Sequence, residues 1–116
     1  MQNFEAVFYV KSDGTSPVRE FIVALEPKMR AKVVRLINML ETNGTELREP
    51  YSKHLRDGVF ELRVQTSSNA SRVLYFYYEG RKVVLTHGFI KKTQTTPPKE
   101  IERAIGYRRE YLERIE

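Results

Sequence analysis

The sequence contains three consecutive strand-like runs that are separated only by short turns: residues 59–66, 72–78 and 82–89. In the first run, apolar and polar side chains alternate, which predicts a strand with one face in the core and one polar face. The second and third runs are joined by the three residues 79–81, a length typical of a β-hairpin. Three strands in succession favour an α+β fold with a mainly antiparallel sheet.

The rest of the chain predicts one further strand and three helices. Residues 4–11 are rich in Phe, Tyr and Val, which suits a short strand covered on both faces. Pro17, which follows a serine, is a typical first helical residue, and Pro27 can open a second helix. The last helix is expected to begin at residues 96–98. The predicted order is β-α-α-β-β-β-α, with an N-terminal helical hairpin and a C-terminal helix, and residues 1–116 are expected to form a single domain.

The composition narrows the class of protein further. The chain of 116 residues has no cysteine, so we expect no disulfide and no thiolate metal site. Two histidines without cysteine make a poor metal site, and no glycine-rich phosphate loop is present, so no cofactor is expected. No apolar run approaches the roughly 20 residues that span a bilayer, and the N-terminus lacks a signal-peptide pattern. These features predict a cytoplasmic protein without a membrane partner.

The formal charge of +5 is concentrated in one segment. Residues 48–92 contain nine Lys and Arg against four Asp and Glu, whereas the remainder has eleven of each kind. Positive charge clustered on a rigid sheet favours a polyanionic partner, most commonly nucleic acid. The alternative interpretation is an ordinary solvated basic face.

Two arginines are the principal candidates for a phosphate site, because arginine can contact a phosphate with two parallel hydrogen bonds. Arg63 lies on the polar side of its strand and Arg72 begins the next one, so a hairpin could bring them close, although the pattern does not fix the register. Tyr75 could stack on an unpaired base, but core packing is the competing interpretation. A structural ion pair is the alternative for Arg72, and a solvated strand face for Arg63. The remaining basic candidates lie near the strand ends: Lys53, Arg56, Arg81, Lys82, Lys91 and Lys92.

Four motifs occur in this order along the chain: K-x-L-x-x-G-V-F-E-L-R from Lys53, S-R-V-L-Y-F from Ser71, G-F-x-K-K from Gly88 and T-P-x-x-E-I-x-x-A from Thr96. Together they resemble the phage-derived group of HigB toxins in the RelE-like superfamily, and the resemblance covers nearly the whole chain. It implies a compact α+β domain whose antiparallel sheet curves around a basic cleft. It also implies the toxin of a type II toxin–antitoxin pair, a metal-independent endoribonuclease that cuts mRNA on translating ribosomes and inhibits translation and growth.

The resemblance also implies partners. The expected protein partner is a HigA-like antitoxin with a helix-turn-helix domain, which would neutralise the toxin and carry the contact to operator DNA. mRNA and the ribosome are the other expected partners. The basic outer positions of the N-terminal helical hairpin, Lys28, Arg30 and Lys32, are our candidate antitoxin-docking surface.

The chemistry implied by this resemblance is attack by the RNA 2′-hydroxyl on the adjacent phosphate. Arg63 and Arg72 would stabilise charge on the phosphate, because preorganised cations usually supply the largest part of such catalysis. Lys53, Lys91 and Lys92 would bind substrate or supply a proton, and His54 or Glu61 is a possible general base. Some HigB proteins have a histidine or tyrosine near the C-terminal end of the active centre. Residues 90–95 offer only lysines, threonines and a glutamine as polar groups. The sequence therefore does not identify the general acid.

Two other functions remain open from the sequence. The chain could be a non-catalytic RNA- or ribosome-binding module of the same fold, in which the charge supplies affinity alone. It could also be a phage accessory factor whose basic face binds an acidic protein.

Overall fold

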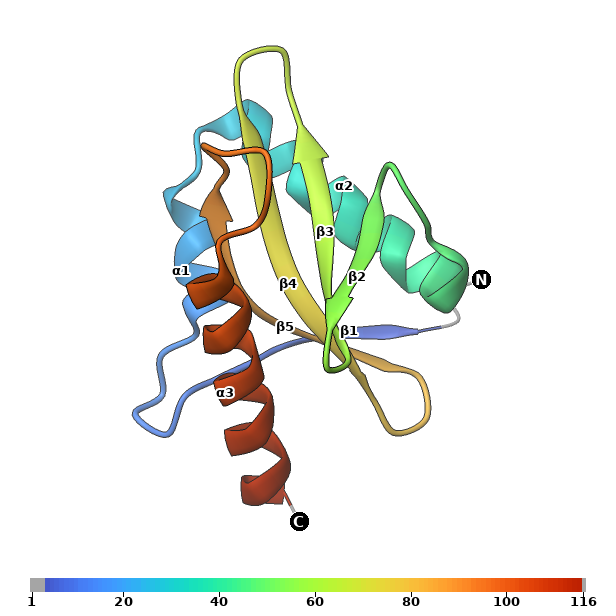
Figure 1. Ribbon diagram of the computed structural model, residues 1–116, viewed down its shortest axis with the longest axis vertical. Coiled ribbons are helices and arrows are strands. Elements are labelled where there is room, and N and C mark those ends of the chain that lie inside the picture. Colours follow the sequence, from blue (N-terminus) through green and yellow to red (C-terminus); the bar gives the residue numbers. More distant parts are fainter. Residues whose placement is uncertain (1–3, 116) are drawn as a thin grey trace.

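The computed structural model describes residues 4–115 and contains a five-stranded mixed sheet with helices on both faces (Figure 1). The order of the strands in the sheet is β1-β5-β4-β3-β2; β1 runs parallel to β5, and every other pair is antiparallel. This arrangement confirms the predicted α+β fold with a mainly antiparallel sheet, an N-terminal helical pair and a C-terminal helix. The elements in chain order are β1 (Glu5–Phe8), α1 (Pro17–Ala24), α2 (Pro27–Asn43), the short 3-10 turn η1 (Gly44–Glu46), β2 (Ser52–Arg56), β3 (Val59–Gln65), β4 (Ala70–Tyr78), β5 (Lys82–Ile90) and α3 (Pro98–Ile115).

The sequence prediction did not include β2, so the true element order has four strands after α2 rather than three. β2 pairs with β3 through the two-residue turn Asp57-Gly58, in which both residues have positive φ. An Asp-Gly turn of this kind is a strong hairpin signal. The sequence of β2 shows no alternation of apolar and polar residues, because Leu55 is its only apolar side chain. β2 lies at the edge of the sheet, where a strand has little apolar surface to bury.

The two N-terminal helices cover one face of the sheet and form the main core with it. The Ser16 side chain accepts a hydrogen bond from the Arg19 amide at the start of α1, and Glu26 accepts from the Met29 amide at the start of α2. Apolar residues recur at helical spacing along α2, and this apolar stripe is buried: Met29, Val33, Leu36, Ile37 and Leu40. These side chains pack with residues of β3, β4 and β5.

Helix α3 covers part of the opposite face. Ala104 is buried there, and Tyr107 and Tyr111 pack near Phe76 of β4. Arg108, which interrupts the apolar pattern of the helix, lies with its guanidinium carbon 5.7 Å from the centre of the Phe76 ring. Figure 1 shows α3 in front of β5, and α3 also packs against Leu74 and Phe76 of β4. The end of the sheet next to the β3–β4 loop has no helix in front of it in this view.

Within the described residues, no helix is long and apolar enough to cross a membrane. The same part of the chain contains no group of three or more His, Cys, Asp or Glu side chains that could hold a metal ion.

Candidate functional site

Arg63 and Arg72 lie directly opposite one another on β3 and β4. The prediction that a hairpin brings these two arginines together is therefore confirmed. Directly paired residues share one face of a sheet, and here it is the face that carries α3, since Leu62 and Val64 belong to the core on the other side. The two arginines lie towards the end of the sheet that α3 leaves uncovered (Figure 1).

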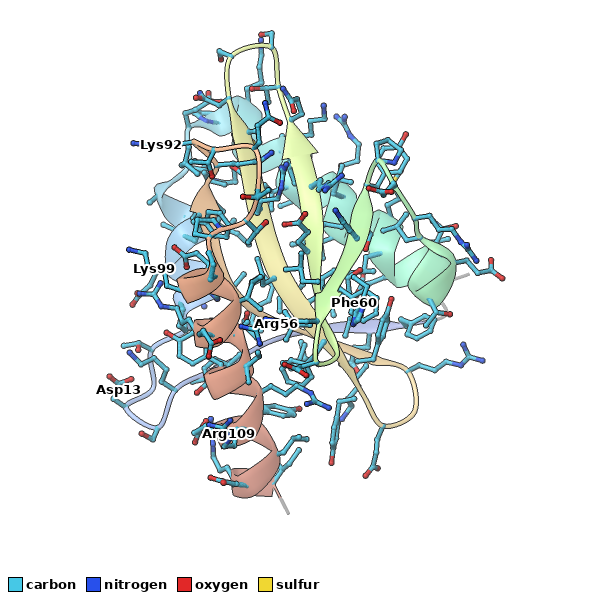
Figure 2. The ribbon with its side chains drawn as sticks, in the orientation of Figure 1. Asp13, Arg56, Phe60, Lys92, Lys99 and Arg109 are labelled. Carbon is cyan, nitrogen blue, oxygen red and sulfur yellow. The ribbon has the colours of Figure 1, made fainter. Side chains whose placement is uncertain are left out.

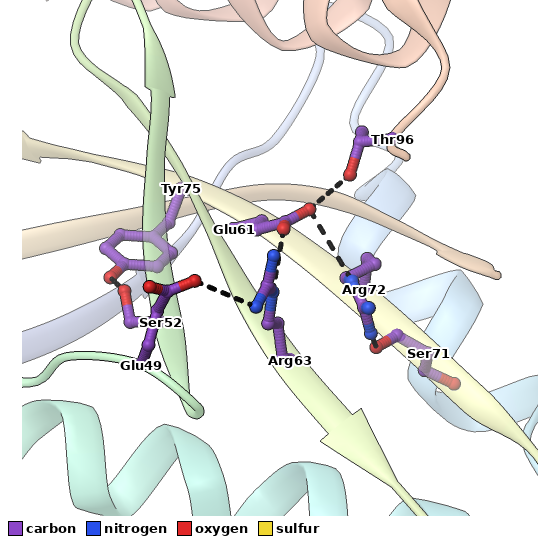
Figure 3. Close-up of polar contacts among 8 residues, drawn as sticks. All are labelled: Glu49, Ser52, Glu61, Arg63, Ser71, Arg72, Tyr75 and Thr96. Atoms are coloured by element: carbon purple, nitrogen blue, oxygen red, sulfur yellow. Dashed lines mark hydrogen bonds and ion pairs between the residues drawn. The ribbon is translucent and has the colours of Figure 1, made fainter. Parts of the chain in front are cut away.

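The carboxylate of Glu61 links the two arginines (Figure 3). Its Oε2 atom accepts a hydrogen bond of 2.9 Å from Arg63 Nε, and its Oε1 atom lies 3.6 Å from Arg72 Nε. The hydroxyl of Thr96, in the loop between β5 and α3, donates a hydrogen bond to Oε1. Glu61 is only 2% exposed, so its charge is held by these partners rather than by water.

Arg72 is also buried, with 6% of its surface exposed. Burial lowers the pKa of its guanidinium and the neighbouring Arg63 lowers it further, whereas Glu61 raises it. Arginine nevertheless stays protonated in proteins, so the structure holds a buried positive charge here. Nη1 of Arg72 donates to the Ser71 carbonyl at 3.1 Å, but its buried Nε atom has no hydrogen-bond partner within residues 4–115.

A pocket of about 260 Å³ lies beside these arginines at the edge of β3. β2 begins at Ser52, so the last residues of β3 pair with β4 on one side and have no strand on the other; on that open side the Arg63 amide donates to the Tyr51 carbonyl at 2.7 Å. Lys32 of α2 reaches the same edge and donates to the Gln65 carbonyl. The pocket is lined by Lys32, Leu36, Pro50, Tyr51, Arg63, Gln65 and Arg72, so three cationic side chains surround it.

Lys91 adds to the positive field at this site. Its amide donates to the Ala70 carbonyl at 2.8 Å, which extends the pairing of β4 and β5 by one residue. Desolvation lowers the pKa of the Lys91 ammonium, and the charges of Arg72 and Arg63 lower it further. Lys91 therefore lies within the electrostatic field of both arginines.

The pocket beside the arginines is not chosen as the candidate site for its volume. A larger groove of about 710 Å³ lies between α1 and the segment after β1, and Phe8, Val10 and Val23 contribute apolar surface to it. Arg19 is the only Lys or Arg among its lining residues. The smaller pocket is the better candidate for an anion, because its cations are held by buried partners.

The other predicted residues of the β2–β3 hairpin are divided between the two faces of the sheet. Lys53 is exposed and pairs with Glu61, so it shares the face of the arginines. His54 pairs with Phe60, with 4.8 Å between the ring centres, and therefore lies on the opposite face. Arg56 forms ion pairs with Asp57 and Glu102. The structure does not bring His54 or Arg56 to the arginine pair.

The predicted cations of β5 lie at its two ends. Lys92 is exposed and follows Lys91, next to the site. Arg81 and Lys82 belong to the β4–β5 turn, at the opposite end of β4 from Arg72. Figure 2 shows Lys92 far from Arg109, which is exposed on the C-terminal half of α3.

The prediction that Tyr75 binds RNA by stacking is wrong. Its side chain is completely buried and packs against Phe60, with 5.5 Å between the ring centres. The hydroxyl forms a hydrogen bond with the Ser52 hydroxyl, and burial raises the pKa of Tyr75. A ring enclosed in this way has no free face for a base, so the competing interpretation of core packing holds.

The three residues proposed to dock an antitoxin make different contacts in the structure, and their role in docking stays a prediction. Arg30 donates hydrogen bonds to the carbonyls of Ile22, Val23 and Leu25 and so satisfies the C-terminal end of α1. Lys32 lines the arginine pocket, and Lys28 is exposed on the first turn of α2.

Three residues around the arginines were not predicted as site residues: Glu49, Tyr51 and Thr96. Thr96 was noted only as a helix start and as part of a family motif. The segment from Thr45 to Tyr51 also supplies Glu49, whose carboxylate lies 3.2 Å from Arg63 Nη1. These contacts depend on the packing of loops that no periodic pattern predicts.

The fold and the site define a small α+β domain with a basic pocket at the edge of β3. A family model described as "Phage derived protein Gp49-like (DUF891)" matches residues 20–108. The chain therefore belongs to the Gp49-like family of phage-derived proteins, which is part of the RelE/HigB-like toxin family. The match includes the whole candidate site from Lys32 to Thr96. No curated protein matches the chain.

Proposed function

We propose that this protein is the toxin of a type II toxin–antitoxin pair, of the HigB type, and that it cleaves mRNA on translating ribosomes without a metal ion. The single observation that carries this proposal is the pair Arg63 and Arg72, held side by side at a basic pocket in a member of a toxin-like family. A HigA-like antitoxin is the corresponding protein partner, and operator DNA would be bound only through that antitoxin.

The pocket can perform the charge-stabilising part of RNA cleavage. The RNA 2′-hydroxyl gives its proton to water and attacks the adjacent phosphorus. The bond to the 5′-oxygen breaks, that oxygen takes up a proton, and a 2′,3′-cyclic phosphate and a 5′-hydroxyl are formed. Nη2 of Arg63 and Nη2 of Arg72 make no hydrogen bond within residues 4–115, so each can donate to a phosphate oxygen. Fixed donors of this kind stabilise the extra negative charge of the transition state.

The lysines supply the remaining contacts in this proposal. Lys32 faces the pocket from α2 and suits a neighbouring phosphate as a point charge. Lys91 is our candidate for the acid that protonates the leaving 5′-oxygen, because its pKa is lowered and it lies within the field of both arginines. Glu61 is a poor candidate for the general base, since its two oxygens are engaged and it is almost completely buried.

The test is mapping of new RNA ends in a translating extract, with and without ribosomes. We compare the wild-type chain with Arg63→Gln and with Arg109→Gln, which removes the same charge from an exposed position on α3. Loss of one transition-state donor is expected to slow cleavage by about 10²–10³-fold in Arg63→Gln. The same cleavage rate in wild type and Arg63→Gln would contradict the proposal. Cleavage without ribosomes would mean that the protein is a nuclease that does not depend on the ribosome.

A second candidate function is an RNA- or ribosome-binding module without catalysis. The observation in its favour is that neither predicted general base is placed to accept a proton from the RNA. His54 lies on the other face of the sheet, and both oxygens of Glu61 already accept hydrogen bonds. This function predicts binding to ribosomes that weakens steeply with salt and produces no new RNA ends.

A further inference from the structure

The hydrogen bond between Thr96 and Glu61 joins three separate parts of the chain at one buried point. Glu61 lies on β3, Arg72 on β4, and Thr96 in the loop that leads into α3 (Figure 3). Thr96 is half-buried, and its hydroxyl donates to the same Oε1 atom that faces Arg72. A threonine hydroxyl has one proton to donate, so this contact uses its donor fully.

Because Thr96 holds Glu61 in this position, the Nε donor of Arg72 has no hydrogen-bond acceptor among residues 4–115. The distance of 3.6 Å from Arg72 Nε to Glu61 Oε1 is too long for a hydrogen bond, and Nε is buried without a partner in the described part of the chain. A buried donor without a partner is costly, and a native structure seldom keeps one without a reason. Nη2, on the same edge of the guanidinium, is not among the buried unpartnered atoms, and Arg72 lines the pocket, so Nη2 is the donor that a phosphate can reach.

We propose that Thr96 is a positioning residue: its hydroxyl holds the Glu61 carboxylate away from Arg72, so that the guanidinium keeps its place at the pocket and its Nη2 donor stays available to a phosphate of the RNA. Without the Thr96 hydroxyl, Oε1 is free to approach Arg72 Nε and form a full charge-assisted hydrogen bond. That contact would draw the guanidinium towards Glu61, neutralise more of its charge and so weaken binding of the phosphate. This inference rests on the proposed role of Arg72 in binding the scissile phosphate.

The change in folding stability of Thr96→Val distinguishes this positioning role from a merely structural one. A tighter Glu61–Arg72 pair satisfies a buried donor, so Thr96→Val is expected to lose little or no folding stability while it loses RNA affinity. A structural hydroxyl would behave in the opposite way, with lower stability and unchanged affinity. Thr96→Val is nearly isosteric, so it removes the hydroxyl and keeps the shape of the loop.

The experiment measures binding of a short single-stranded RNA whose 2′-hydroxyls are methylated, together with cleavage of mRNA in a translating extract. Loss of one charge-assisted hydrogen bond predicts about tenfold weaker binding by Thr96→Val and a lower kcat. Thr96→Ser keeps the donor and is expected to restore both values. The matched control is Thr95→Val, an exposed position in the same loop, which should behave as wild type.

The outcomes keep this inference separate from the proposed function. Binding by Thr96→Val within twofold of wild type overturns the inference, and so does a failure of Thr96→Ser to restore binding. If the wild-type chain binds the RNA but never cleaves it, the proposed function fails and the binding comparison still decides the role of Thr96. If Thr96→Val does not fold, the ¹⁵N signal of Arg72 Nε in the wild type decides: it should shift as RNA is added, and an unchanged signal overturns the inference.

Discussion

Neutralising Glu61 should destabilise the protein much more than neutralising the other carboxylate that contacts Arg63. Glu61→Gln keeps the size of the side chain and leaves a carbonyl that can accept from Thr96. It removes the negative charge between Arg72, which is buried, and Arg63, whose side chain is 26% exposed. Removing one partner of a buried ion pair costs about 3–5 kcal/mol, and the partial exposure of Arg63 places the expected loss at about 3 kcal/mol.

The matched control is Glu49→Gln. Glu49 also contacts Arg63, at 3.2 Å, but its side chain is 62% exposed. Exposed ion pairs contribute about 0.5 kcal/mol, so Glu49→Gln should lie within that amount of the wild type. The two variants remove the same charge from the same arginine and differ in burial.

Urea unfolding followed by far-UV circular dichroism measures both losses, and equal m-values would show that only stability has changed. For a domain of this size, about 3 kcal/mol corresponds to a fall in Tm of roughly 12 °C. If Glu61→Gln lost no more than Glu49→Gln, the arginines would not depend on a buried counter-charge. That result would refute the claim that the buried Glu61 carboxylate stabilises the two arginines.

Three further predictions concern the folded state. Burial lowers the pKa of His87 from its ordinary value of 6.5, so the unfolded chain binds this proton more tightly than the folded chain does. The contribution of His87 to stability is therefore fully present above about pH 6.5 and is lost as the pH falls below it. His87→Gln should flatten this fall in unfolding free energy, measured by urea unfolding at several pH values, and an unchanged pH dependence would contradict the prediction. A Cβ on Gly88 would lie 2.4 Å from a ring carbon of Phe21, so Gly88→Ala should cost about 1–3 kcal/mol in thermal or urea unfolding, and no loss would contradict this packing. Gly106→Ala, a helical position with open space around it, should instead gain about 0.5–1 kcal/mol.

Much of the fold could be predicted because it depends on local patterns. The alternation in residues 59–66 placed Leu62 and Val64 in the core, and the helical stripe of α2 was buried as expected. The edge strand β2 could not be found in this way, since an edge strand has little apolar surface to bury. Its Asp57-Gly58 turn was the available signal.

The site was predictable only in part. The pattern placed Glu61 and Arg63 on one face, and the short β3–β4 turn allowed Arg63 and Arg72 to meet. It also suggested that this face was open, whereas Glu61 is buried beside the loop that carries Thr96. Lys32 reached the pocket from α2, a contact set by how the helix packs on the sheet.

The most direct test of the account is the chemistry of the RNA ends. An mRNA with a single 2′-deoxy nucleotide at a mapped cleavage position is added to the translating extract with the wild-type chain. The account predicts that cleavage at this position is lost, and that the unmodified mRNA yields a 2′,3′-cyclic phosphate and a 5′-hydroxyl. Continued cleavage of the 2′-deoxy substrate, with 5′-phosphate ends, would mean that water and not the 2′-hydroxyl attacks the phosphorus, and would contradict the proposed role of the arginine pocket.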